Sequence, residues 1–224
     1  DVCSSDLQAR PKVIIANAAG NINLVMQELM RQQQFLEGMG LEPTVMNVAD
    51  GAKMMGGILG GDIDCSTMAG FGQVFPAIER GGKLKVLAGA ALLPTLTVFT
   101  GKADIKSLKD LEGRTFGTGS IGALLHQLAV AILMKRGVDV KKIRFVNIGS
   151  SADVFRGVIV GTLDAGFGET GIIETAERLK VRALPDGNLS TDLTEYTFQG
   201  AWASDRVIET KRETLVKTLA ADRK

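Results

Sequence analysis

Apolar and polar positions along the chain follow two alternating patterns, one typical of buried strands and the other of amphipathic helices. Residues 12–18 form a short apolar run rich in β-branched side chains, and Val25, Leu29 and Leu36 then recur at helical spacing. The further expected strands are residues 43–48, 63–68, 84–90, 114–116, 143–148 and 163–167, and the further expected helices are residues 50–59, 71–79, 123–135 and 151–160. This alternation indicates an α/β fold with mainly parallel strands.

The chain also repeats part of its own pattern one hundred residues later. Residues 45–52 are echoed by residues 145–152, and residues 57–64 by residues 157–164. The identical pairs at this offset are Asn47/Asn147, Ala52/Ala152, Gly57/Gly157, Gly61/Gly161 and Asp64/Asp164. Because a whole strand-helix-strand unit is echoed, we expect two similar lobes, each a mainly parallel sheet flanked by helices, with a ligand cleft between them.

The repeat suggests where each lobe begins and ends. We expect a first lobe over residues 8–97, a second over residues 98–193, and a return to the first lobe over residues 194–224. Residues 96–100, with the turn at residues 101–104, and residues 196–203 are expected to be the two crossings between the lobes. Residues 1–7 match one reading frame of a common sequencing adapter, so we expect them to be a non-native scar. We also expect the C-terminus to be truncated, since Lys224 ends the chain without a helix cap or stop signal.

Composition narrows the classes of function. The 224 residues are 45% hydrophobic and 23% charged, with a formal net charge of +1. This is an ordinary globular composition. Lys and Arg are spread thinly along the chain, which argues against electrostatic capture of nucleic acid or of an anionic membrane. No apolar run approaches the roughly 20 residues that span a bilayer. Cys65 is expected to be a buried lone thiol, because Cys3 falls within the suspected scar.

The loops that follow the expected strands carry the candidate site, since ligands bind at the carboxyl ends of strands in open α/β sheets. Backbone N–H groups at helix N-termini there would hold a carboxylate, sulfonate or phosphate. The candidate ligand-binding residues are Asn21, Asp50, Thr67, Met68, Ala69, Leu92, Gly119, Ser120, Ile121, Ser150, Ser151, Glu169 and Thr170. No Arg or Lys falls in these loops, which disfavours a multiply charged anion, and Asp50 and Glu169 would suit an amine or an amino-heterocycle.

Other motifs do not support a cofactor or a catalytic centre. Residues 117–122 form a literal GxGxxG, but residues 144–149 lack the acidic residue that a dinucleotide site needs at the end of the next strand. His126 has no cysteine or serine partner at readable spacing, so we expect no metal, no cofactor and no catalytic residues. Asp64 and Asp164 are interpreted as structural, because each follows a helix-ending glycine at the start of a strand.

Several of these segments together resemble a known family. They are the strand entries at residues 61–64 and 161–164, the segment 105–114, and the loop 117–122. They look like those of type II periplasmic substrate-binding proteins, and most resemble the branch that serves ABC importers of aliphatic sulfonates, nitrate and thiamine precursors. The resemblance extends over residues 12–221.

The resemblance implies an extracytoplasmic solute-binding protein without catalysis. It would be a bacterial monomer in the periplasm, or lipid-anchored at the outer face in a Gram-positive source, that closes on a small organic ligand by a hinge motion. It would deliver the ligand, such as a carboxylate, a sulfonate or an amino-heterocycle, to an ABC permease and its ATPase. Two alternatives stay open: an enzyme of the same fold, of the thiamine-pyrimidine synthase or menaquinone-pathway lyase type, and the effector domain of a transcription regulator.

Overall fold

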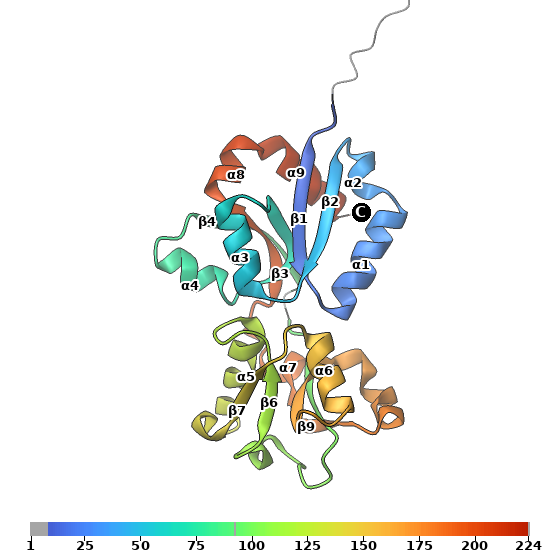
Figure 1. The fold of residues 1–224 in the computed structure, drawn as a ribbon, viewed down its shortest axis with the longest axis vertical. Helices are drawn as coiled ribbons and strands as arrows, with labels where there is room; N and C mark the ends of the chain where they lie inside the picture. Colours follow the sequence, from blue (N-terminus) through green and yellow to red (C-terminus); the bar gives the residue numbers. More distant parts are fainter. Residues whose placement is uncertain (1–8, 92, 224) are drawn as a thin grey trace, which may run out of the picture.

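Two lobes lie one above the other along the long axis of the molecule (Figure 1). The structure is a computed structural model that describes residues 9–91 and 93–223. The suspected scar, the terminal Lys224 and Leu92 lie outside the described residues. Among the helices described, none is both long enough and apolar enough to cross a bilayer.

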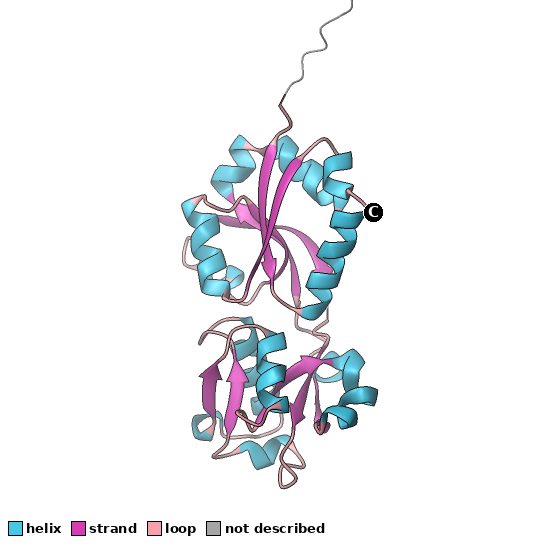
Figure 2. Ribbon diagram, turned by 45° about the vertical axis from the view of Figure 1, so that its right-hand side comes forward, coloured by secondary structure: helices cyan, strands magenta, loops and turns pink. Residues whose placement is uncertain are grey.

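The first lobe is a five-stranded sheet with helices on both faces (Figure 2). Its strand order is β2 (Glu42–Val48), β1 (Lys12–Ala18), β3 (Cys65–Gly70), β10 (Gln199–Ser204) and β4 (Leu84–Ala91). The first three strands are mutually parallel, and β10 runs antiparallel to both of its neighbours. The helices are α1 (Asn21–Gln32), α2 (Phe35–Gly38), α3 (Gly51–Gly60), α4 (Val74–Glu79), α8 (Asp205–Thr210) and α9 (Arg212–Ala221).

The second lobe repeats this arrangement strand for strand. Its order is β7 (Arg144–Asn147), β6 (Thr115–Thr118), β8 (Ala165–Glu169), β5 (Leu96–Thr100) and β9 (Arg182–Asn188), and β5 is the strand that runs antiparallel to both of its neighbours. Its helices are α5 (Leu124–Lys135), α6 (Ser151–Ile159) and α7 (Leu189–Asp192), with 3-10 segments η1 (Leu108–Leu111), η2 (Val140–Lys142) and η3 (Thr170–Leu179).

Each lobe has its own apolar core. In the second lobe Phe116 and Phe167 are fully buried on adjacent strands, with ring centroids 5.3 Å apart in an edge-to-face arrangement. In the first lobe one cluster under α3 includes Ile58 and Trp202, and a second cluster includes Leu41 beneath α2 and α9. Because the apolar clusters of one lobe share no residue with those of the other, the lobes can act as separate bodies.

The repeated aspartates tie β1 to the start of β3 in the first lobe and β6 to the start of β8 in the second. An Asp64 carboxylate oxygen accepts the backbone N–H of Ile14 at 2.9 Å and pairs with Lys211 at 2.8 Å. An Asp164 carboxylate oxygen accepts the backbone N–H and the hydroxyl of Thr115 at 2.9 and 2.8 Å. Their role is structural, as interpreted, although the N–H groups belong to the neighbouring strand and not to a turn.

The α/β class and the two similar lobes are confirmed, with one topological difference. Residues 96–100 and 196–203 were expected to be crossings between lobes, but most of them are strands β5 and β10. Leu96 and Thr97 therefore lie in the sheet of the second lobe, and the chain changes lobes between β4 and β5 and again between α7 and β10. Each sheet is mainly parallel, with a single reversed strand that arrives from the other lobe.

Candidate ligand-binding cleft

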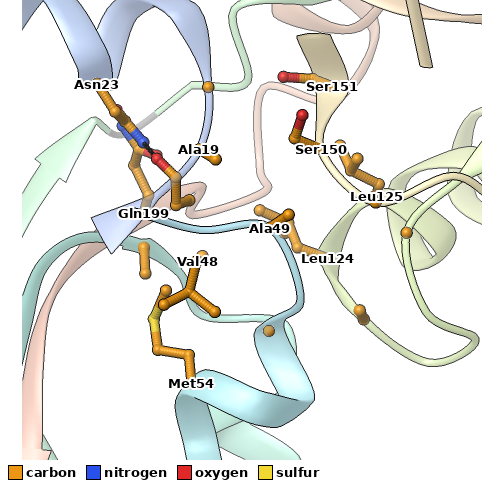
Figure 3. A pocket seen from close by; sticks show the side chains of 18 of the residues that line it. Ala19, Asn23, Val48, Ala49, Met54, Leu124, Leu125, Ser150, Ser151 and Gln199 are labelled. Atoms are coloured by element: carbon orange, nitrogen blue, oxygen red, sulfur yellow. Dashed lines mark hydrogen bonds between the residues drawn. The ribbon is translucent and has the colours of Figure 1, made fainter. Parts of the chain in front are cut away.

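A cavity of about 180 Å³ lies between the lobes and is lined by residues of both. In Figure 3, Val48 and Met54 of the first lobe lie across from Leu124 and Ser150 of the second. The cavity opens at the carboxyl ends of β1, β2 and β3 on one side and of β6, β7 and β8 on the other. This is the edge at which the parallel strands of α/β sheets present their loops to ligands.

Helices α1 and α3 of the first lobe and α5 and α6 of the second begin at the cavity. Asp50 caps α3 by accepting the N–H groups of Ala52 and Lys53 at 2.8 and 3.2 Å, and Ser150 caps α6. In contrast, α1 follows Gly20 and α5 follows Ala123, and neither helix has a side-chain cap. The first-turn N–H groups of α1 and α5 are therefore suited to donate to a ligand, in the partial positive field of the helix ends.

Asn23 is a rigid polar element of the cavity wall. Its Nδ2 donates to the carbonyl oxygens of Ala18 and Met68 at 3.0 and 3.2 Å, and its Oδ1 accepts from Gln199 Nε2 at 3.3 Å (Figure 3). These bonds join α1 to two strands and to the chain segment that returns from the second lobe. Asn23 therefore orients Gln199 beside the cavity.

Glu169 is the only ionisable side chain among the described residues that line the cavity. It ends β8 and accepts the hydroxyl of Thr95 at 3.3 Å, and its Oε1 lies about 4 Å from the position that a Cβ atom would take at Gly20 in the other lobe. Burial raises the pKa of Glu169, against the opposing effect of the Thr95 hydrogen bond. The carboxyl group can therefore accept a hydrogen bond as the anion or donate one when protonated.

The rest of the wall is largely apolar. Met54, Leu124 and Leu125 line it together with Trp202, which is 2% exposed. Trp202 Nε1 is buried and has no hydrogen-bond partner among the described residues. An unpaired buried N–H is costly, so a ligand with an acceptor group that reaches it would gain free energy.

Six of the predicted ligand-binding residues line the cavity. They are Ala69, Gly119, Ser120, Ser150, Ser151 and Glu169. Two others lie beside it: the Asp50 carboxylate accepts the Ser120 hydroxyl, and the Thr170 hydroxyl is 3.0 Å from that of Thr97. The strand-end rule therefore brought together residues that are about 100 positions apart in the chain.

Four other predicted residues, all of them described, do not line the cavity. Met68 is buried in the core of the first lobe, and Thr67 binds Asn17 and lines a second cavity of about 370 Å³ beneath α1. The cause is that β3 continues to Gly70, two residues beyond its expected end. Asn21 is exposed on α1, and Ile121 is 67% exposed on the β6–α5 loop. Leu92 lies outside the described residues.

The sequence-based prediction missed several lining residues. They include Asn23, Val48, Met54, Leu124, Leu125 and Gln199. Four of these lie within the first turn of a helix that starts at the cavity, so extending each predicted loop by one helical turn would have found them. Gln199 begins β10, which was expected to be a crossing, and no local pattern indicates its position.

The two mixed sheets, the paired crossings and the cleft define a two-lobed protein of the type II periplasmic-binding fold. The solved structures that share this fold include the following three. A protein of Bordetella bronchiseptica RB50 has a TM-score of 0.77 at 19% identity, over 94% of this chain and 69% of that one. The alkanesulfonate-binding protein SsuA of Xanthomonas axonopodis pv. citri, bound to MOPS, has a TM-score of 0.74 at 17% identity, over 94% of this chain and 71% of that one. A Candida albicans protein described as having the generic periplasmic binding protein fold has a TM-score of 0.72 at 14% identity, over 95% of this chain and 69% of that one.

The chain belongs to the NMT1/THI5-like family, whose family model matches residues 29–224. No curated protein matches the chain. The expected resemblance to the periplasmic substrate-binding proteins is confirmed by this family and by the shared fold.

Proposed function

We propose that the protein is an extracytoplasmic solute-binding protein that captures a small organic molecule between its lobes and delivers it to an ABC permease. The observation that carries the proposal is the cavity at the carboxyl ends of both sheets, between lobes joined by two crossings. Such a cleft can close around a ligand by rotation of one lobe against the other. The alkanesulfonate-binding SsuA of the same fold supports this role.

The chemistry of the wall favours a neutral or singly charged ligand. No Lys or Arg occurs among the described residues that line the cavity, so a multiply charged anion would lack a counterion. Glu169 offers an acceptor for an N–H group, while α1 and α5 offer backbone donors. An amino-heterocycle packed on the apolar wall satisfies both, and a monovalent carboxylate or sulfonate at the helix ends is the second ligand class.

The side chains around the cleft favour binding without catalysis. Glu169 has no second ionisable group beside it among the described lining residues, and general acid-base chemistry usually employs a pair. His126 does not line the cavity. Its Nδ1 accepts the N–H of Gly122, its ring packs on Phe145 with centroids 4.7 Å apart, and burial lowers its pKa. These observations support a receptor over an enzyme of the same fold.

Isothermal titration calorimetry tests the proposal with a panel of amino-pyrimidines, carboxylates and sulfonates. We expect one site per chain and, for a ligand with an N–H donor, about 10- to 100-fold weaker binding by Glu169→Gln, since hydrogen bonds to charged groups are the strong ones. Glu174→Gln, on the exposed side of η3, is the matched control and should bind like the parent chain. Absence of binding across the panel, or turnover of a bound member, would contradict the proposal.

A further inference from the structure

A side-chain hydrogen bond joins the two lobes at the edge of the cavity, which we call the mouth of the cleft. The Ser120 hydroxyl, on the β6–α5 loop of the second lobe, donates to Asp50 Oδ2 of the first lobe at 2.7 Å. The same hydroxyl accepts from Asn147 Nδ2 at 3.4 Å, so both of its hydrogen-bonding roles are satisfied. The bond has no role in the core of either lobe.

Asp50 is held ready for this contact by its own helix. Its Oδ1 accepts the N–H groups of Ala52 and Lys53, which leaves Oδ2 directed at the second lobe. The Ser120 hydrogen bond is the main cause that lowers the pKa of Asp50, with the two backbone bonds adding to it against burial. A charged acceptor whose orientation is fixed in advance loses little entropy when the lobes meet.

The Asp50–Ser120 pair lies far from the crossings about which the lobes would rotate. Asp50 follows β2, and β2 is separated in its sheet from β10, which follows the return crossing, by β1 and β3. Three strand spacings amount to about 14 Å. A rotation about the crossings therefore separates Asp50 from Ser120 early and widely. Contacts near the crossings, such as Gln127 Nε2 to the Gly72 carbonyl at 2.7 Å, change less.

We infer that Asp50 and Ser120 form a latch that sets the balance between open and closed lobes, and that Asp50 acts on the ligand only through closure. Asp50 does not line the cavity, so it is a positioning residue and not a ligand contact. That the latch tunes ligand affinity rests on the proposed function, because affinity falls in proportion to the fraction of the competent closed state. The latch itself is a property of the ligand-free chain.

Distances between spin labels test the latch without any ligand. Labels on Leu59→Cys at the end of α3 and Met134→Cys on α5 report the lobe separation, since both positions are exposed and lie away from the mouth. Cys3 is replaced by Ser, and Cys65, which is buried, stays unlabelled. For Ser120→Ala we expect the ratio of closed to open lobes to fall about tenfold, the effect of losing a hydrogen bond to a charged group.

Three comparisons make the result specific to the latch. Ser120→Thr keeps the hydroxyl and should keep the short distance. Ser190→Ala removes a hydroxyl that donates to Asn188 Oδ1 at 2.7 Å within the second lobe, and it should change nothing. Asp50→Ala combined with Ser120→Ala should open the lobes no further than the larger single effect, because the two changes remove the same bond.

Several results would overturn the latch. They are an unchanged distance in Ser120→Ala, an equal shift in Ser190→Ala or Ser120→Thr, or strictly additive shifts in the double variant. Circular dichroism of each variant establishes that the lobes remain folded. The calorimetric panel tests a different claim. If no member of the panel binds, solute binding is refuted and the latch result still stands. If Ser120→Ala does not change the label distance, the latch is refuted and solute binding still stands.

Discussion

Gly70 ends β3 at the point where the lobes touch, and we predict that Gly70→Ala prevents full closure. A Cβ atom at this position would lie 2.1 Å from Leu124 Cδ2, 2.9 Å from its Cγ and 3.0 Å from its Cβ in the other lobe, whereas ordinary contacts are 3.4–4 Å. Rotation of the Leu124 tip alone cannot relieve the contact with Cβ. The lobes must therefore separate, or Leu124 must change rotamer and α5 must shift by a few tenths of an ångström.

Overpacking of this kind costs about 1–3 kcal/mol. Because the clash exists only when the lobes meet, that free energy lowers the closed population and the ligand affinity by about 5- to 150-fold. The free energy of unfolding of each lobe should change little. Small-angle X-ray scattering and the spin-label distances measure the closed fraction, and calorimetry measures the affinity.

The matched control is Gly171→Ala on η3, where an added Cβ would meet nothing within 4 Å. It should close and bind like the parent chain. If Gly70→Ala closed to the same distance and bound equally well, the packing of Leu124 against Gly70 could not be a condition of closure. The reasoning from the interlobe contact would then be wrong.

Three further predictions concern the lobes themselves. Gly200→Ala should lower the melting temperature by several degrees, because its Cβ would lie 2.2 Å from the Ala88 carbonyl oxygen inside the sheet. Asp164→Ala should cost about 1–2 kcal/mol at pH 7 in urea unfolding. Burial opposes the effect, but the Thr115 bonds lower the pKa of Asp164, so its contribution is present above about pH 4 and lost as the pH falls further. Native Cys65 should not react with a thiol reagent at pH 8, since burial raises its pKa to about 12.

The two-lobed architecture could be predicted because local signals repeat. Asp64 and Asp164 make the same strand-to-strand bonds in both lobes, so their offset of one hundred residues reflects a real equivalence in space. Likewise, Ser120 and Ser150 follow strands and Glu169 ends one, and these strand ends meet at the cleft. The strand-end rule needs only the strand positions.

What could not be predicted depends on contacts between distant segments. Gln199 reaches the cavity because β10 inserts between β3 and β4, a pairing that spans more than one hundred residues. Met68 was misplaced because a strand that is buried throughout shows no alternation to mark its end. Asp50 carries a carboxylate in a suitable loop, but that carboxylate accepts the Ser120 hydroxyl of the other lobe, a pairing that the sequence does not indicate.

The positions of β5 and β10, the strands that follow the two crossings, explain why closure and binding are coupled. Each lobe is completed by a reversed strand, β5 or β10, that the chain delivers from the other lobe. Both crossings therefore run into the interior of a sheet, next to the strands β3 and β8 that end at the cavity. A rotation about these crossings moves the loops of both lobes together, and it moves those farthest from β10 the most. Residues at the edge, such as Asp50, are consequently placed to sense closure, while Gln199 beside the crossing stays near the ligand throughout the motion.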